Sequence, residues 1–312
     1  MLNGNEKILV TGGTGQLGSC LIEQLVEGGL KPFVMGRRIE RSPILQKLLH
    51  DGKILFASVD LMEEAAPIED ALRGFSPETL IHLGSVVDQR SDFFSSSRQT
   101  ITVNLIGMVH LLQSLPDLKM ICYASTTSVY GIPEFLPIDE RHPTNPVNTY
   151  AASKLAAEKY LTLFSESKGI PAALLRISSV YSELRYAPEL QRAIPEYLRA
   201  VRDGSDLVVW GKGDAKQDYI YIDDVISAIL LSVEKRFNGL LNIATGESHT
   251  VQEAAERIRG VDGKSLSIKQ KPVDTKAADY AYDIRLARSQ IGFSPRYSFE
   301  DGLSRCVSAL KR

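Results

Sequence analysis

The sequence predicts an α/β protein with a doubly wound parallel sheet and a smaller, discontinuous C-terminal lobe. Short runs rich in β-branched residues alternate with segments of helical spacing over the first 177 residues. Parallel strands need a crossover connection, usually a helix, so this alternation favours a parallel sheet. Several runs are apolar throughout, as expected for strands covered on both faces. The expected strands cover residues 7–10, 32–35, 54–59, 80–83, 120–124 and 172–177, with helices at 17–27 and 103–115.

The regular alternation of expected strands and helices ends after residue 177. The expected elements are a loop at 182–188, a helix at 189–202, a strand at 207–210, a glycine-rich turn at 211–214, a helix at 223–234 and a strand at 240–244. We therefore predict a sheet domain formed by residues 1–177 and 218–246. The smaller lobe, formed by residues 178–217 and 247–312, is expected to close over the C-terminal edge of the sheet.

Composition argues against several classes of protein. The 312 residues are 44% hydrophobic and 24% charged, which is ordinary for a globular protein. A formal net charge of −2 argues against a nucleic-acid partner, and no apolar run approaches the roughly 18 residues of a membrane span. The short polar N-terminus lacks the pattern of a signal peptide. The widely separated Cys20, Cys122 and Cys306 favour free thiols and a cytoplasmic location.

A glycine-rich loop follows the first expected strand and opens the first expected helix. Its pattern places Gly12, Gly15 and Gly18 where they permit a tight turn, close approach of a pyrophosphate and close helix–sheet packing. A plain glycine-rich turn is the alternative, but the flanking strand and helix favour a dinucleotide-binding Rossmann domain. No Gly-Lys-Ser/Thr ending follows, which disfavours an ATP-type loop.

The end of the second strand predicts the cofactor preference. An acidic residue at this position binds the ribose 2′-hydroxyl of NAD, whereas an arginine accommodates the 2′-phosphate of NADP. Here the strand ends with Arg37 and Arg38, and no carboxylate appears before Glu40. We therefore favour NADP over NAD, although both arginines would also suit a solvated turn. Asp60, at the end of the third strand, would accept a hydrogen bond from adenine or simply be exposed.

Tyr150 and Lys154 begin a helical segment and are four residues apart, so they share one helix face. A phenol with a pKa of ~10 is a poor base at neutral pH, but a nearby cation lowers that pKa. The pair is therefore suited to move a proton between a hydroxyl and a carbonyl while a nicotinamide carries the hydride. A buried tyrosine beside a solvent-seeking lysine is the alternative. Hydroxyl residues at 125–128 end the fifth strand, on the ligand-binding edge of the sheet.

Taken in order, these motifs resemble the extended short-chain dehydrogenase/reductases. The likeness is to their NAD-dependent epimerase/dehydratase family, which acts on nucleotide sugars. It covers nearly the whole chain and includes Thr-Gly-Gly-Thr-Gly from residue 11, Ser-Thr-Thr-Ser-Val-Tyr-Gly from 125, Tyr-x-x-x-Lys from 150 and Leu-Asn-Ile-Ala-Thr-Gly from 241.

The resemblance implies a role for each matching position. Thr126 would hold the sugar hydroxyl, Tyr150 would transfer the proton, and Lys154 would bind the nicotinamide ribose and tune the tyrosine. The expected cofactor contacts are Gly12, Gly15, Gln16, Leu17, Arg37, Arg38, Asp60, Leu61, Leu83, Gly84, Ser85 and Asn104, besides Tyr150 and Lys154. The expected substrate contacts are Ser85, Thr126, Thr127, Ser179 and Gln217. The apolar faces of the helices at 103–115 and 155–164 would suit plain core, whereas the resemblance implies that they form a homodimer interface.

The sequence departs from the family pattern at several of these positions. Dehydratases and decarboxylases of the family carry an acid where this chain has Thr127 and Ser128, so simple redox chemistry or epimerisation is favoured. An arginine that contacts the substrate diphosphate is replaced by Gln217, although the adjacent Lys216 would supply a positive charge. A second arginine, expected before the Asp283 region, is also absent, although Lys271 would align with it. Ser179 also replaces the usual asparagine, so the substrate pocket is atypical.

Three functions are consistent with these observations. The first is hydride transfer at a sugar carbinol or ketone, C4 of a nucleotide sugar being the expected position, by an epimerase or a ketoreductase. The second is NADPH-dependent reduction of a non-sugar carbonyl compound. The third is dinucleotide sensing without catalysis, for which the proton-transfer groups would be unnecessary. No metal site is expected, because the five histidines show no metal-ligand spacing.

Overall fold

We describe a computed structural model of the chain. It describes residues 6–62, 65–87, 92–184, 192–262, 266–272 and 278–311. The chain forms two compact units. The first unit comprises Met1–Gly131, Pro143–Arg176 and Ala228–Leu241, and the second comprises Ile132–His142, Ile177–Ser227 and Asn242–Arg312. Segments 132–142, 218–227 and 242–246 thus group with the second unit, whereas the sequence placed them in the sheet domain. Compact units are defined by contacts within the chain, so the predicted boundaries of the functional domains stay a prediction.

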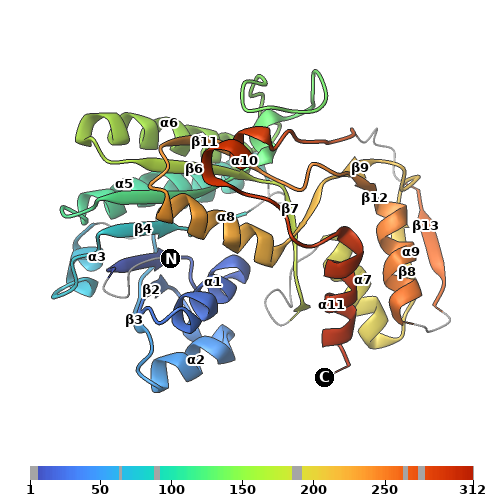
Figure 1. The fold of residues 1–312 in the computed structure, drawn as a ribbon, viewed down its shortest axis with the longest axis horizontal. Coiled ribbons are helices and arrows are strands. Elements are labelled where there is room, and N and C mark those ends of the chain that lie inside the picture. The colour runs from blue at the N-terminus through green and yellow to red at the C-terminus, as the bar shows by residue number, and fades with distance from the viewer. Residues whose placement is uncertain are drawn as a thin grey trace. The chain divides into compact units, whose positions relative to one another are not determined.

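A seven-stranded sheet forms most of the core of the first unit. Its strands are β1 (Ile8–Thr11), β2 (Phe33–Gly36), β3 (Leu55–Ser58), β4 (Thr79–His82), β5 (Met120–Thr126), β6 (Ala172–Ile177) and β11 (Gly239–Ile243). Their order is β11-β6-β5-β4-β1-β2-β3, and the pairs from β3 through β5 are parallel (Figure 1). The predicted doubly wound fold is confirmed. The order reverses between β1 and β4, where ligands bind in open α/β sheets.

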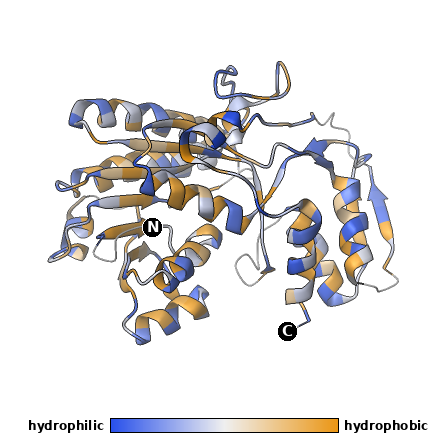
Figure 2. Ribbon diagram, viewed as in Figure 1, coloured by the Kyte–Doolittle hydropathy of each residue, from blue (hydrophilic) through white to orange (hydrophobic). Residues whose placement is uncertain are grey.

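Burial in this sheet depends on the position of each strand as well as on its apolar sequence. Every residue of β1, β2 and β4 is buried, because helices cover both faces of these strands. The edge strand β3 is only partly buried, although its sequence is as apolar as that of its neighbours. Figure 2 shows the hydrophobic residues concentrated along the sheet and the helices beside it.

The helices of the first unit match the predicted pattern with one exception. They are α1 (Gln16–Glu27), α2 (Pro43–His50), α3 (Ala65–Ala71), α4 (Phe93–Ile101), α5 (Gly107–Gln113) and α6 (Thr149–Lys168), and α8 (Ile222–Glu234) continues into this unit from the second. The helix expected over 103–115 is interrupted, because a π-helical turn, η2 (Thr102–Ile106), joins α4 to α5. Packing is tight at this point, since a Cβ on Gly107 would lie 2.2 Å from the carbonyl oxygen of Leu61.

The described residues of the second unit form three two-stranded sheets. Strand β7 (Ser179–Tyr181) pairs with β10 (Tyr219–Tyr221), β8 (Leu207–Trp210) with β13 (Ile268–Lys271), and β9 (Lys216–Gln217) with β12 (His249–Thr250). Its helices are α7 (Ala193–Asp203), α9 (Val251–Asp262), α10 (Arg285–Ile291) and α11 (Phe299–Ala309). The predicted strand at 207–210 is β8. The predicted helix at 189–202 corresponds to α7, which begins at residue 193; residues 185–191, and with them most of the predicted loop at 182–188, lie outside the described residues.

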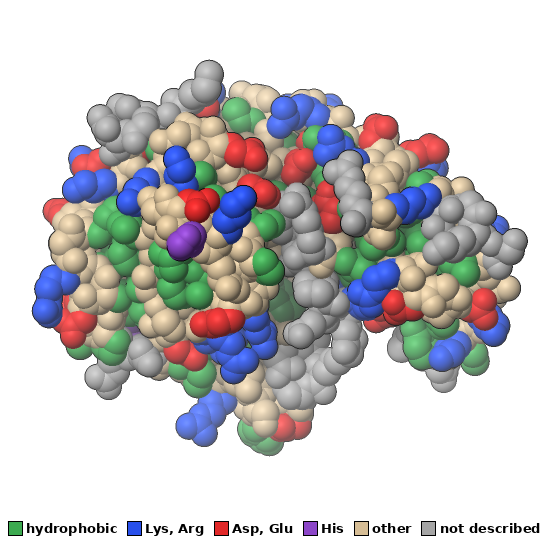
Figure 3. Space-filling model, turned by 90° about the horizontal axis from the view of Figure 1, so that it is seen from below, with side chains coloured by type: hydrophobic (Ala, Val, Ile, Leu, Met, Phe, Trp, Pro, Cys, Tyr) green, Lys and Arg blue, Asp and Glu red, His purple; other side chains and the backbone are tan. Residues whose placement is uncertain are grey.

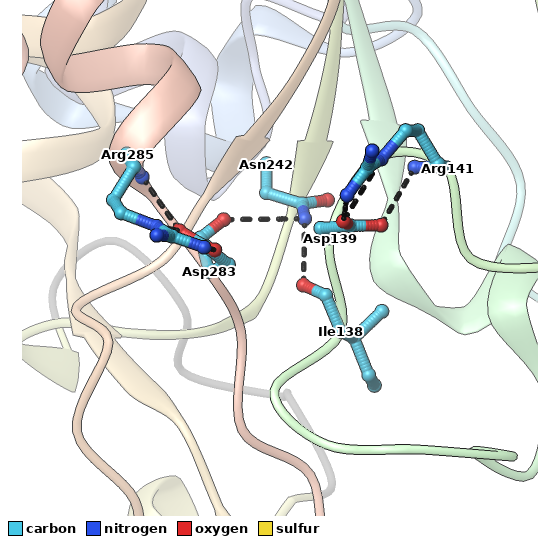
Figure 4. A network of polar contacts seen from close by, with 6 residues as sticks. All are labelled: Ile138, Asp139, Arg141, Asn242, Asp283 and Arg285. Carbon is cyan, nitrogen blue, oxygen red and sulfur yellow. Dashed lines mark hydrogen bonds and ion pairs between the residues drawn. The ribbon is translucent and has the colours of Figure 1, made fainter.

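Asn242 explains why segment 132–142 belongs to the second unit. Its buried side-chain amide donates hydrogen bonds to the carbonyl oxygens of Ile138 (3.0 Å) and Asp283 (3.4 Å), as Figure 4 shows. Its backbone N–H donates to the carboxylate of Glu140 (2.8 Å). Three segments far apart in the chain are thereby held together at the end of β11.

Basic and acidic side chains are interspersed on the face drawn in Figure 3. Among the described residues, no helix has the length and apolar character needed to cross a membrane. The same residues contain no group of three or more histidines, cysteines or acids placed to hold a metal ion.

Candidate active site

The glycine-rich loop connects β1 to α1 and adopts a conformation that requires glycine. Gly12 has a φ of +67°, and a Cβ there would lie 2.5 Å from the backbone nitrogen of Gly84. A Cβ on Gly18 would lie 2.4 Å from the carbonyl oxygen of Gly12. These two glycines therefore allow the loop to pack against the end of β4 and against the first turn of α1.

The first turn of α1 begins after Gly15, its N-cap, which has no side chain to bond the N–H groups of that turn. Such a helix end attracts phosphate groups through its N–H groups and its dipole. Gln16 and Leu17 begin the helix and are half-buried.

A cavity of about 340 Å³ lies beside this loop, within the first unit. It is bordered by the carboxyl ends of β1, β2, β3 and β4. The predicted residues that line it are Gly12, Gly15, Arg37, Arg38, Asp60, Leu61, Leu83, Gly84 and Ser85. Gln16, Leu17, Asn104, Tyr150 and Lys154, also predicted to contact the cofactor, are not part of its lining. Thr14, Arg41 and Val86 also line it but were not predicted. Thr14 lies within the glycine-rich motif, whereas Arg41 and Val86 contribute through the folding of loops and have no motif of their own.

The fit of a dinucleotide to this cavity can be judged from two observations. The loop packs so closely against the end of β4 and against its own first residues that a Cβ at Gly12 or Gly18 would clash with the backbone, so the loop has the tight turn that the dinucleotide fingerprint requires. The hydroxyl of Ser85 is buried in the cavity wall and has no hydrogen-bond partner among the described residues. A buried polar group without a partner is costly, so a ligand that bonds it would be stabilised. Both observations suit a dinucleotide.

Positive charge gathers at the β2 end of the cavity. Arg37, Arg38 and Arg41 line it there, and Asp60 is the one carboxylate among the described lining residues. The Nη1 of Arg37 lies 3.8 Å from Oδ2 of Asp60, and 62% of the Arg37 side chain is exposed. An exposed ion pair at this distance is weak, so the Arg37 guanidinium remains available to a phosphate.

Tyr150 and Lys154 lie on the first turns of α6. The helix begins at Thr149, because the side chain of Asn148 accepts a hydrogen bond from the Ala151 N–H (2.8 Å) and caps it. Tyr150 is 8% exposed and Lys154 is 2% exposed, which excludes a lysine that extends into solvent. The Nζ of Lys154 lies 4.1 Å from the ring centroid of Tyr123. Burial lowers the pKa of Lys154 to about 7, while the charge of Glu158 opposes the shift.

The hydroxyl residues at the end of β5 are well ordered by local bonds. Thr126 is half-buried, its Oγ1 accepts a hydrogen bond from the Ser128 N–H (3.2 Å), and its hydroxyl donates to Ser128 Oγ (3.1 Å). It thereby caps the 3₁₀ turn η3 (Thr127–Tyr130). Thr127 is buried.

Asn104 links the cavity wall to helix α6. Its amide oxygen accepts from the Val86 N–H (2.8 Å), and its NH₂ group donates to Val86 O (3.0 Å) and to Ser153 Oγ (2.9 Å). The Ser153 hydroxyl in turn donates to the carbonyl oxygen of Tyr150 (2.8 Å). Asn104 therefore orients the helix that carries Tyr150 and Lys154, whereas the resemblance suggested a direct cofactor contact.

His82 occupies a buried position behind the glycine-rich loop. Its Nδ1 lies 2.6 Å from Thr11 Oγ1, and its ring stacks on Tyr123 with centroids 5.5 Å apart. Burial lowers its pKa to about 3, so the imidazole is neutral. No motif had singled out this residue as part of the site.

Ser179 and Gln217 are in the second unit. The Ser179 N–H donates to Asp218 O (3.2 Å) within the β7–β10 pairing, and Gln217 pairs with His249 in the β9–β12 ladder. Both side chains are half-buried. Asp218 is committed to structure, because its carboxylate accepts hydrogen bonds from the N–H groups of Thr245 and Gly246.

The fold and these features define a dinucleotide-binding α/β protein with a buried tyrosine–lysine pair. The family model for the NAD dependent epimerase/dehydratase family matches residues 8–244, and the chain therefore belongs to this family. The resemblance noted from the sequence motifs is confirmed, and the chain is an enzyme of the extended short-chain dehydrogenase/reductase type.

Relatives match over almost the whole chain. The UDP-glucose 4-epimerase of Thermus thermophilus, solved in complex with NAD, has a TM-score of 0.86 and 26% identity, covering 98% of this chain and 99% of that one. The UDP-glucose 4-epimerase of Thermotoga maritima, solved with UDP-glucose, has a TM-score of 0.85 and 26% identity, covering 98% of each. The dTDP-4-dehydro-6-deoxyglucose reductase of Escherichia coli is 25% identical over 311 residues, covering 97% of each chain.

Proposed function

We propose that the enzyme epimerises a nucleotide sugar at C4 through a transient ketone. The observation that carries this proposal is the buried Tyr150–Lys154 pair, which Asn104 and Ser153 tie to the wall of the dinucleotide cavity. The relatives named UDP-glucose 4-epimerase support the substrate class. We assign the substrate contacts to Ser85, Thr126, Thr127, Ser179 and Gln217.

The protein groups would handle the proton and the geometry of the reaction. A bound nicotinamide supplies the chemistry of accepting and returning the hydride. Tyr150 takes the proton of the C4 hydroxyl and later returns it, and Thr126 holds the same oxygen in place. The Lys154 ammonium favours the ionised form of Tyr150. Thr127 and Ser128 lack an acidic group, which favours epimerisation over elimination.

The direct test supplies the purified enzyme with UDP-glucose or UDP-N-acetylglucosamine and follows the C4 epimer by proton NMR. We expect interconversion without added cofactor, together with a dinucleotide that mass spectrometry detects after denaturation. Failure to epimerise UDP-, dTDP- and GDP-hexoses, with no competition by the free nucleoside diphosphates, would contradict the proposal.

A nucleotide-sugar ketoreductase is the second candidate. The arginines at the end of β2 favour it, because NADPH normally drives reductions, and one relative is a dTDP-4-dehydro-6-deoxyglucose reductase. This enzyme would convert a 4-keto sugar only when NADPH is supplied, and the purified protein would release no dinucleotide.

We further propose that the cavity prefers NADP(H) to NAD(H), with Arg37 and Arg38 binding the 2′-phosphate. A charge-assisted contact contributes about 1.5–3 kcal/mol, so the double variant Arg37→Ala/Arg38→Ala should bind NADPH about tenfold to a hundredfold more weakly. Its affinity for NADH should change little. Fluorescence titration measures both, with the exposed Arg73→Ala as the control. Tighter binding of NADH than NADPH by the unmodified enzyme would overturn the preference.

A cytoplasmic homodimer is the proposed form of the enzyme. Apolar side chains are exposed on the predicted dimer helices and beside them, namely Phe93, Phe94, Ile101, Ile106 and Leu163. A second copy would remove this surface from water. Cys20, Cys122 and Cys306 are buried and form no disulfide bond, which suits a reducing compartment. Light scattering measures the mass in solution.

A further inference from the structure

A buried ion pair lies behind Lys154 on helix α6. Glu158 is one helical turn beyond Lys154 and is 3% exposed. Its carboxylate accepts hydrogen bonds from Arg176 Nη2 (2.8 Å) and Arg176 Nε (3.1 Å), and from the Ser125 hydroxyl. The Arg176 guanidinium lies over the ring of Tyr130, with its carbon 4.6 Å from the ring centroid.

The stability of the fold does not by itself account for this arrangement. Taking two charges out of water costs free energy that their attraction often fails to offset, and apolar replacements of similar size are frequently as stable. The position of the Glu158 carboxylate relative to Lys154, however, is fixed by the helix and by its hydrogen bonds. Tyr150, Lys154 and Glu158 follow one another at intervals of four residues on one face of α6. Arg176 and Ser125 hold Glu158 to β6 and β5, the strands beneath that face.

We propose that Glu158 is a positioning residue that acts through Lys154, holding the buried lysine in its charged form so that it can assist proton transfer at Tyr150. The role in proton transfer rests on the proposed function, whereas the effect on Lys154 does not. Arg176 and Ser125 hold the Glu158 carboxylate in place through their hydrogen bonds.

The charges around Lys154 indicate in which direction Glu158 changes the pKa of this lysine. The groups facing it are Tyr150 and Glu158 on α6, Tyr123 on β5 and His82 on β4. Burial raises the pKa of Tyr123 and lowers that of His82, so both are neutral near pH 7. Glu158 is the group whose charge raises the pKa of Lys154 against the effect of burial. Arg176 and Tyr130 lie beyond Glu158.

The sign of the predicted shift follows from this balance. Without the Glu158 charge, the pKa of Lys154 falls further below its present value of about 7. The ammonium form is lost above this pKa, so the loss occurs at lower pH in the variant. The alkaline limb of the pH–kcat profile therefore moves to lower pH, and a shift of one unit reduces the charged fraction at pH 8 by about tenfold.

The test measures the titration of Lys154 directly by NMR of lysine labelled at the side-chain nitrogen, with the signal assigned through Lys154→Met. Glu158→Gln alone leaves Arg176 charged and unpaired, so the main variant is the double substitution Glu158→Gln/Arg176→Met. We expect its Lys154 pKa to fall by about one unit or more, and the exposed Glu166→Gln on the same helix to leave it unchanged.

Two outcomes decide the inference. An unchanged Lys154 pKa in the folded double variant overturns it. If that variant does not fold, the fallback is Ser125→Ala, which keeps the charges of Glu158 and Arg176. We expect it to lower the pKa of Lys154 by less than the double variant would. An unchanged Lys154 pKa in Ser125→Ala also overturns the inference. If the unmodified enzyme turns over no nucleotide sugar, the proposed function fails, but the titration of Lys154 still tests the role of Glu158.

Discussion

Replacing Tyr150 with phenylalanine is expected to reduce turnover by about 10²- to 10⁴-fold, while the dinucleotide still binds. The ring would keep its buried position at the start of α6, because Tyr150→Phe removes only the hydroxyl. Without that hydroxyl no group on this face takes the proton from the sugar. Steady-state kinetics with the nucleotide sugar and a separate dinucleotide titration measure the two effects.

Tyr160 provides a matched control for this substitution. It lies on the same helix but is 54% exposed, so Tyr160→Phe should leave kcat unchanged. Full activity of Tyr150→Phe would contradict the assigned proton transfer. Loss of dinucleotide binding together with activity would instead indicate a structural role for the hydroxyl.

Replacing Gly12 with alanine is expected to remove dinucleotide binding, with a loss of at least about a hundredfold in affinity. The substitution has two costs. An alanine at a φ of +67° is strained by about 1–2 kcal/mol. Its Cβ would also lie 2.5 Å from the Gly84 nitrogen, so the loop or the end of β4 must move. Either movement disturbs the glycine-rich loop in front of α1.

Gly52 separates these two costs. Its φ of +65° is nearly the same, but a Cβ there meets no atom within 4 Å among those described. Gly52→Ala should therefore show the strain in its thermal unfolding and retain full dinucleotide affinity. If both variants bind the dinucleotide equally well, the proposed contact between the loop and the end of β4 has no role in binding.

The sequence by itself determined the features that depend on short-range patterns. Apolar runs and helical spacing predicted six strands of the first unit and their assembly into a parallel, doubly wound sheet, because burial imposes these periods on any covered strand or helix. The glycine-rich loop and the four-residue spacing of Tyr150 and Lys154 could also be recognised in the sequence. In each case a local conformation needs a particular residue or interval.

Only the tertiary structure decided which distant residues meet. The π-helical turn at Thr102–Ile106, the contact of Asn104 with Ser153, the position of Arg41 in the cavity wall and the pairing of Glu158 with Arg176 have no local signature. The grouping of segment 132–142 with the second unit depends on Asn242, about a hundred residues further along the chain. Such contacts arise from the packing of separate elements, and a hydrogen bond or ion pair between them imposes no spacing that the sequence could display.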